Sequence, residues 1–125
     1  MVSLDFDAQM ESGTIIESRE FENELRKHGH LIVFVHSPWS GYSKMGLQKF
    51  RSIMERLPDI HWIVIDNMSG NSFVYDWLLG QSGKQVIHGN GEFFEVREGV
   101  LQWFVSSSYL ATKDEIEEKV CSGLI

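Results

Sequence analysis

Two serine residues lie where a buried strand gives way to a helix, and they are the residues of this chain best placed to do chemistry. They belong to the segment WSGYSK, residues 39–44, which follows the apolar run of residues 31–35. Backbone N–H groups at the start of a helix are unpaired and stabilise an anion there. A thiol at such a position becomes a reactive thiolate, whereas a serine hydroxyl has a far higher pKa and needs an adjacent base. The helix start would therefore activate a thiol at this position, but it does not by itself activate the serine hydroxyls that this chain carries there.

Ser40 could act as a nucleophile for acyl transfer only with a base beside it. His36 is the nearest candidate in the sequence, but we expect it to end the strand and point away from the helix start. The chain also lacks the G-x-S-x-G segment of a nucleophile elbow. We therefore predict that Ser40 is the N-cap of the helix and that Ser43, in the early turn, bonds backbone N–H groups.

Apolar periodicity and turn residues predict five strands and four helices. Continuous β-branched and aromatic runs indicate strands buried on both faces, and apolar residues at helical spacing indicate amphipathic helices. The predicted strands are 14–16, 31–35, 60–65, 92–96 and 100–105, and the predicted helices are 18–28, 41–57, 72–79 and 112–120. Ser18 should cap the first helix, Gly29 should end it in the left-handed conformation, and residues 80–84 should form a loop. Thr112 and Glu115 have the capping-box spacing at the start of the last helix.

The order β-α-β-α-β-α-β-β-α predicts an α/β fold with a mixed central sheet. Strands that alternate with helices pair in parallel through right-handed crossovers, and the last two form an antiparallel hairpin around Gly99. The chain shows no internal repeat and no linker. We predict a single domain over residues 14–125, preceded by a loose N-terminal lead-in over residues 1–13.

The W-x-G-x-x-K turn between strand and helix resembles the active-site segment of the thioredoxin-like superfamily. Asp66-Asn67 resembles the Asp-x-Asn region that ends the family's third strand. Residues 86–91 resemble its V-x-G-x-P approach to a cis-proline, with Gly91 at the proline position. The segment HSPWSGYS, residues 36–43, is also similar to the H-S-x-x-C-x-x-S site of bacilliredoxins, apart from the cysteine. The resemblance covers residues 14–120. It implies a three-layer α/β/α sandwich, and the best-known activity of the superfamily is thiol–disulfide exchange.

Three places depart from that family. Ser40 stands where the resemblance puts the nucleophilic thiolate, with Ser43 at the second cysteine position. Gly91 replaces the cis-proline, so we expect a trans peptide bond before it. Phe34 lies near the position of a buried carboxylate that assists proton transfer. Together these departures predict a redox-inactive member in which no catalytic residue is in place.

We predict that this member binds a protein partner at the surface of the former active site, formed by Trp39, Gly41, Tyr42, Asn90 and Gly91. Aromatic side chains on an exposed turn supply large contact area, although Trp39 could instead pack on the neighbouring loop. Two other functions stay open. The chain could be a thiol–disulfide oxidoreductase present here as a Cys→Ser form, or a protein that binds glutathione or another small thiol.

Composition and charge narrow the range of partners. The chain has 125 residues, of which 42% are hydrophobic, and a formal net charge of −7, which argues against a nucleic acid held through its phosphates. No apolar run approaches the roughly 20 residues of a membrane helix. The single cysteine, Cys121, allows no internal disulfide. We expect a cytoplasmic monomer or weak dimer that has no cofactor.

The histidines give no prediction of a metal site. His28 and His30 are close in sequence, but they flank a helix end, and we expect no carboxylate or cysteine at ligand spacing from them. His61 and His88 are isolated in the sequence and carry no assignment.

Overall fold

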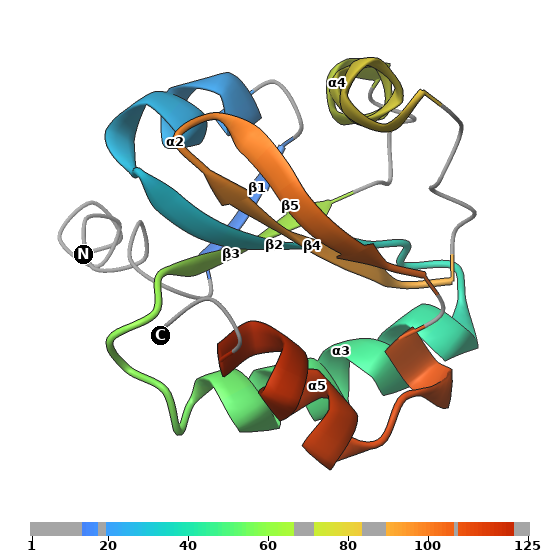
Figure 1. Ribbon diagram of the computed structural model, residues 1–125. Coiled ribbons are helices and arrows are strands. Elements are labelled where there is room, and N and C mark those ends of the chain that lie inside the picture. Colours follow the sequence, from blue (N-terminus) through green and yellow to red (C-terminus); the bar gives the residue numbers. More distant parts are fainter. Residues whose placement is uncertain (1–13, 18–19, 67–71, 84–89, 107, 122–125) are drawn as a thin grey trace, which may run out of the picture.

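A five-stranded mixed sheet forms the middle layer of the molecule (Figure 1). The computed structural model describes residues 14–17, 20–66, 72–83, 90–106 and 108–121. The strands are β1 (Thr14–Glu17), β2 (His30–His36), β3 (Trp62–Asp66), β4 (Glu92–Arg97) and β5 (Val100–Val105). Their order across the sheet is β1-β3-β2-β4-β5. The first three pair in parallel, whereas β4 and β5 each pair antiparallel, as the sequence predicted.

Helices cover both faces of the sheet and make three layers. Figure 1 shows α2 (Phe21–Lys27) and α4 (Ser72–Ser82) on one face, and α3 (Gly41–Met54) and α5 (Lys113–Cys121) on the other. A short 3-10 helix, η2 (Ser108–Leu110), lies beside the start of α3. The predicted α/β/α sandwich is therefore confirmed.

The central strand β2 supplies the core on both sides of the sheet. Residues 31–35 are all buried, and alternate side chains point to opposite faces because a strand has a period of two. Val33 packs in the cluster that contains Phe21 of α2. Phe34 packs in the other cluster, with Phe50 of α3 and Ile116 of α5. This strand is thus packed from both sides, and it positions the segments at its two ends.

Helix ends explain most differences from the sequence prediction. Thr112 and Glu115 exchange the two capping-box hydrogen bonds, at 2.8 and 3.1 Å, so that prediction is confirmed. The left-handed Gly29 is wrong, because the chain leaves α2 through an extended His28 at φ −127° and enters β2 directly. Helix α4 continues through Ser82 where a loop was predicted, and α3 ends at Met54 instead of residue 57.

Some predictions concern residues that the structure does not describe. The lead-in of residues 1–13, the Ser18 cap and His88 lie outside the described residues.

The β4–β5 hairpin turns through Glu98 and Gly99, both at positive φ, as the glycine predicted. Among the described residues, no helix is long and apolar enough to cross a membrane.

Candidate functional site

Ser40 forms the N-cap of α3. Its backbone is extended, at φ −104° and ψ 121°, and its Oγ accepts a hydrogen bond from the Ser43 backbone N–H at 3.2 Å. Its carbonyl accepts from the Lys44 N–H at 3.1 Å, which closes the first helical turn. The predicted cap is confirmed. The hydroxyl oxygen at the activating position therefore satisfies a helix donor that would otherwise be unpaired.

Ser43 lies one turn further on and is fully buried. Its Oγ accepts a hydrogen bond from the Ser37 backbone N–H at 2.9 Å, as predicted for an early-turn serine. The same Oγ lies 2.8 Å from Nδ1 of His36. The prediction that His36 points away from the helix is wrong. His36 ends β2, as predicted, but the period of two places it on the same face as Phe34, toward α3.

Burial lowers the pKa of His36 below its ordinary value of 6.5, and the positive charges of Lys44 and Arg51 lower it further, while Asp66 opposes them. The ring is therefore neutral at pH 7, and Nδ1 can accept the Ser43 hydroxyl proton. This hydrogen bond has the form of a serine–histidine pair. However, Ser43 Oγ is buried and already accepts from a backbone N–H, so it has no room to attack a carbonyl carbon.

Gly91 lies next to Ser43 on the interior side of the site. It is buried, and its φ of +84° is a conformation that residues with a side chain rarely adopt. A Cβ placed on it would lie 3.0 Å from the Ser43 Cα and 3.1 Å from the Phe34 ring. No described peptide bond is cis, which agrees with the expected trans bond before Gly91. Proline fixes φ near −65°, so this backbone does not accommodate the proline that the resemblance calls for.

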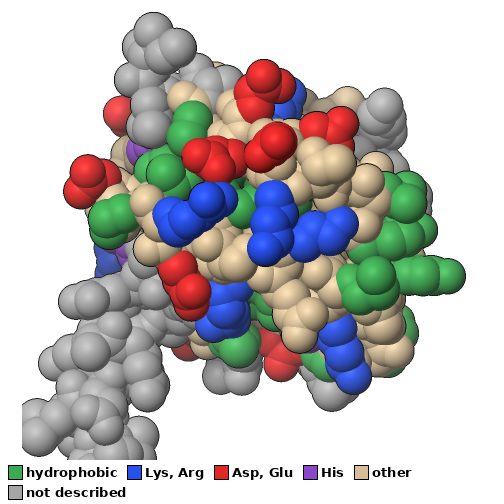
Figure 2. Space-filling view, turned by 90° about the horizontal axis from the view of Figure 1, so that it is seen from below, with side chains coloured by type: hydrophobic (Ala, Val, Ile, Leu, Met, Phe, Trp, Pro, Cys, Tyr) green, Lys and Arg blue, Asp and Glu red, His purple; other side chains and the backbone are tan. Residues whose placement is uncertain are grey.

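Apolar side chains gather on the surface around the start of α3. Trp39 is 62% exposed and Tyr42 54%, and the Tyr42 ring stacks on Tyr109 with centroids 4.3 Å apart. Met45, one turn along α3, and Leu110 of η2 are also exposed. We call these five residues the aromatic tip. Figure 2 shows hydrophobic side chains gathered at the edge of this face where α3 begins.

The predicted binding residues differ in how accessible they are. Trp39 and Tyr42 are exposed, as is Gly41, whose Cα faces open space. The alternative that Trp39 packs on a loop does not fit its 62% exposure. Asn90 is half-buried and donates its N–H to Glu92 at 3.2 Å. Gly91 is buried, so its part in binding a partner stays a prediction.

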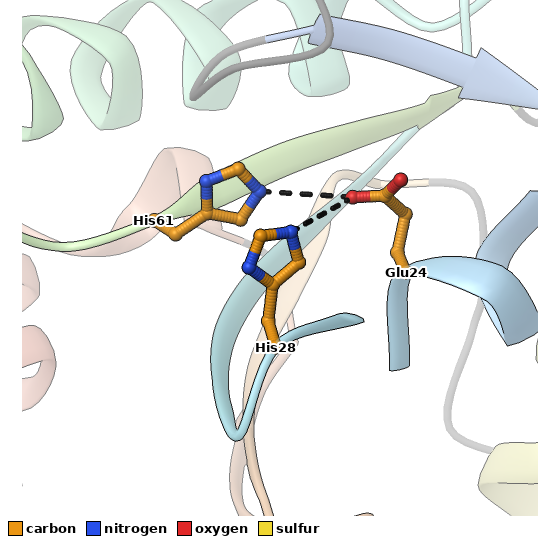
Figure 3. A group of neighbouring side chains, drawn as sticks. All are labelled: Glu24, His28 and His61. Atoms are coloured by element: carbon orange, nitrogen blue, oxygen red, sulfur yellow. Dashed lines mark ion pairs between the residues drawn. The ribbon is translucent and has the colours of Figure 1, made fainter. Parts of the chain in front are cut away.

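A second group of polar side chains meets at the opposite end of β2, where none was predicted. His28 and His61 both approach Glu24 (Figure 3). His30 pairs with Glu95 instead, at 2.5 Å. The expectation that no carboxylate lies at ligand spacing from His28 is wrong. Glu24 precedes His28 by four residues, and this spacing brings the two side chains together across the end of a helix. His61 could not be placed by spacing, because the sheet brings it in from a distant segment.

Known proteins resemble this chain in structure only. No protein-family profile and no curated protein sequence matches it. Thioredoxin f from spinach chloroplast has a TM-score of 0.70 to this chain, at 16% identity over 91% of this chain and 88% of that one. Plasmodium falciparum thioredoxin has a TM-score of 0.68, at 14% identity over 87% of this chain and 97% of that one. Mitochondrial thioredoxin 3 from Saccharomyces cerevisiae has 0.62, at 15% identity over 88% and 94%.

Identities this low carry no information about activity, and the finer likeness to bacilliredoxins stays a prediction. The fold, by contrast, is similar over 87–91% of this chain and 88–97% of each neighbour. Strand order, the helices on both faces and these solved structures together show that the chain has a thioredoxin-like fold.

Proposed function

We propose that this chain is a redox-inactive thioredoxin-fold protein that binds a protein partner through its aromatic tip. The observation that carries the proposal is the exposure of Trp39 and Tyr42, 62% and 54%, at the start of α3. Large aromatic side chains supply contact area with little loss of conformational entropy, and they are enriched where proteins bind tightly. The fold gives the position, and the residues at that position suit binding better than redox chemistry.

Redox inactivity is supported by what occupies the two cysteine positions. Ser40 Oγ caps the helix, and Ser43 Oγ is buried between a backbone N–H and His36. Hydroxyls form no disulfide and carry no thiolate. The single cysteine, Cys121, is half-buried at the last residue of α5. We expect the protein to reduce insulin no faster than buffer containing the same dithiol.

The conformation of Gly91 supports a chain adapted to these serines. A site that had lost only its sulfurs would keep a backbone suited to proline, whereas Gly91 is at φ +84° and touches Ser43. Its carbonyl also accepts the Ser108 N–H at 3.0 Å, so η2 already uses a backbone group that an extended peptide could otherwise pair with. The partner would therefore bind through side chains on the aromatic tip.

The experiment compares partner capture by three proteins of equal stability. Wild-type chain, Trp39→Ala and a control, Val100→Ala, serve as baits, and captured proteins are quantified by mass spectrometry. Val100 is also apolar and 53% exposed, but it lies at the β4–β5 turn. We expect a protein that is enriched by wild type and Val100→Ala and lost with Trp39→Ala, while the unfolding free energy of Trp39→Ala stays within about 0.5 kcal/mol of wild type. Identical capture by all three would contradict the proposal.

One observation favours the alternative of an oxidoreductase present in a Cys→Ser form. Position 40 is an N-cap, where the helix would stabilise a thiolate. The Ser40→Cys, Ser43→Cys double variant separates the two readings. If the alternative holds, this variant reduces insulin as a thioredoxin does. If our proposal holds, it stays inactive or nearly so, because Gly91 does not present a substrate as proline would.

A further inference from the structure

Three side chains from separate parts of the fold converge at the end of β2 that is remote from the aromatic tip. Glu24 lies on α2, His28 directly follows that helix, and His61 directly precedes β3. Figure 3 shows both imidazole rings directed at the same carboxylate oxygen. The distances from Glu24 Oε1 are 3.5 Å to His28 Nε2 and 3.7 Å to His61 Nε2. The seven residues of β2 separate this cluster from the serines by roughly 20 Å.

The buried carboxylate of Glu24 has fewer hydrogen bonds than the burial of its charge normally requires. Its side chain is only 3% exposed, and Oε1 makes no hydrogen bond with any described residue. Its other oxygen lies 3.6 Å from the ammonium of Lys27, which is itself more than half exposed. A buried carboxylate normally holds two or more hydrogen bonds or a bound cation, because desolvating its charge is costly. Oε1 therefore points into a place where a cation is favoured.

The spacing of the three groups suits ligands of one ion better than hydrogen bonds between them. Hydrogen bonds from ring nitrogen to oxygen span about 2.7–3.2 Å. Two ligands of a tetrahedral zinc ion, each about 2.0–2.2 Å from the metal, lie roughly 3.3–3.5 Å apart. The observed 3.5 and 3.7 Å fall close to that separation, and all three ligand atoms lie within 4.8 Å of one another.

We propose that Glu24, His28 and His61 bind a divalent cation of the zinc class. Two imidazoles and one carboxylate are a ligand set that zinc takes in proteins, and the set leaves a fourth position open. The side chains of His28 and His61 are 30% and 20% exposed, so an ion can reach the cluster from solvent. Their rings stack nearly parallel with centroids 3.8 Å apart, so one ring turns about its side-chain bonds when both Nε2 atoms bind the same ion. The bound ion joins the end of α2 to the start of β3 and stabilises the fold.

The test uses the untagged full chain after treatment with a chelator. Calorimetric titration with Zn²⁺ and visible absorption with Co²⁺ are the two readouts. We expect one ion per chain, a Tm that rises with added Zn²⁺, and affinity about tenfold or more weaker in Glu24→Gln, His28→Asn and His61→Asn. Glu22→Gln, on the same helix but 60% exposed, should bind as wild type does. His30→Asn should do so as well, because His30 pairs with Glu95 instead.

Two results would overturn the proposal. One is the absence of binding by both Zn²⁺ and Co²⁺ in folded wild-type protein. The other is binding that survives in the folded ligand variants, or that the Glu22→Gln control loses equally. Circular dichroism establishes which variants fold, and three ligand variants are used so that a misfolded one does not decide the outcome. The rise of Tm with Zn²⁺ must also be smaller in every folded ligand variant.

Discussion

The two ends of β2 carry polar clusters of similar size whose groups are satisfied in different ways. At the carboxyl end, His36, Ser43 and Ser40 bond to one another and to backbone N–H groups, and Gly91 packs directly against them. At the amino end, Glu24 is buried and one of its oxygens has no hydrogen bond from the described residues. A cluster whose polar groups hydrogen-bond to one another and to the backbone contributes to stability. A buried charge that lacks such hydrogen bonds is a candidate site for a ligand.

The largest effect that this comparison predicts is at Gly91. Gly91→Ala forces a side chain onto a φ of +84° and puts its Cβ 3.0 Å from a backbone atom of Ser43. Left-handed strain of about 1–2 kcal/mol and overpacking of about 1–3 kcal/mol together should lower the unfolding free energy by about 3 kcal/mol in urea denaturation. Gly83→Ala is the matched control, because its φ is +79° but its Cβ would face open space. Equal losses in both variants would mean that the carboxyl-end cluster is loosely packed.

A smaller loss is expected at Ser43. Ser43→Ala removes a buried hydroxyl that accepts from the Ser37 N–H and contacts His36. We expect a loss of about 1–2 kcal/mol, against about 1 kcal/mol for Ser40→Ala, which removes only the helix cap. Urea denaturation of the two variants measures the difference. If Ser43→Ala were neutral, the serine–histidine pair would not be structural, and a catalytic role for it would have to be considered again.

At the other end of β2 the same kind of change should have a smaller effect. In metal-free protein, Glu24→Gln removes a desolvated charge along with its ion pairs, and these contributions oppose each other. We therefore expect the unfolding free energy to change by less than about 1 kcal/mol, in either direction. With Zn²⁺ present, wild type should become the more stable of the two. A large loss without metal would show that the carboxylate is a structural group, and the contrast between the two ends would disappear.

The sequence predicted the fold and the helix cap because both depend on local patterns. The apolar run of β2, the Ser40 cap and the capping box at Thr112 are each readable from a few neighbouring residues. His36 ends the strand as predicted, but its direction was predicted wrongly, because the apolar run does not show which face of the sheet α3 covers. The Glu24 cluster was missed because His61 joins it only through the pairing of β2 with β3.

The pH dependence of stability is the smallest effect and tests the His36 hydrogen bond directly. Burial lowers the pKa of His36 below its unfolded value near 6.5, so the unfolded chain binds its proton more readily than the folded one. The stability that neutral His36 contributes is fully present above pH 6.5 and is lost as the pH falls below it toward the folded pKa. Urea midpoints at pH 7.5 and 5.5 should therefore decline more in wild type than in His36→Asn. The ring is only partly buried, which limits the difference, and every contribution that the two proteins share cancels in the comparison. An equal decline would mean that protonated His36 is accommodated beside Ser43, so the polar groups at the carboxyl end would not be as fully satisfied as the hydrogen bonds indicate.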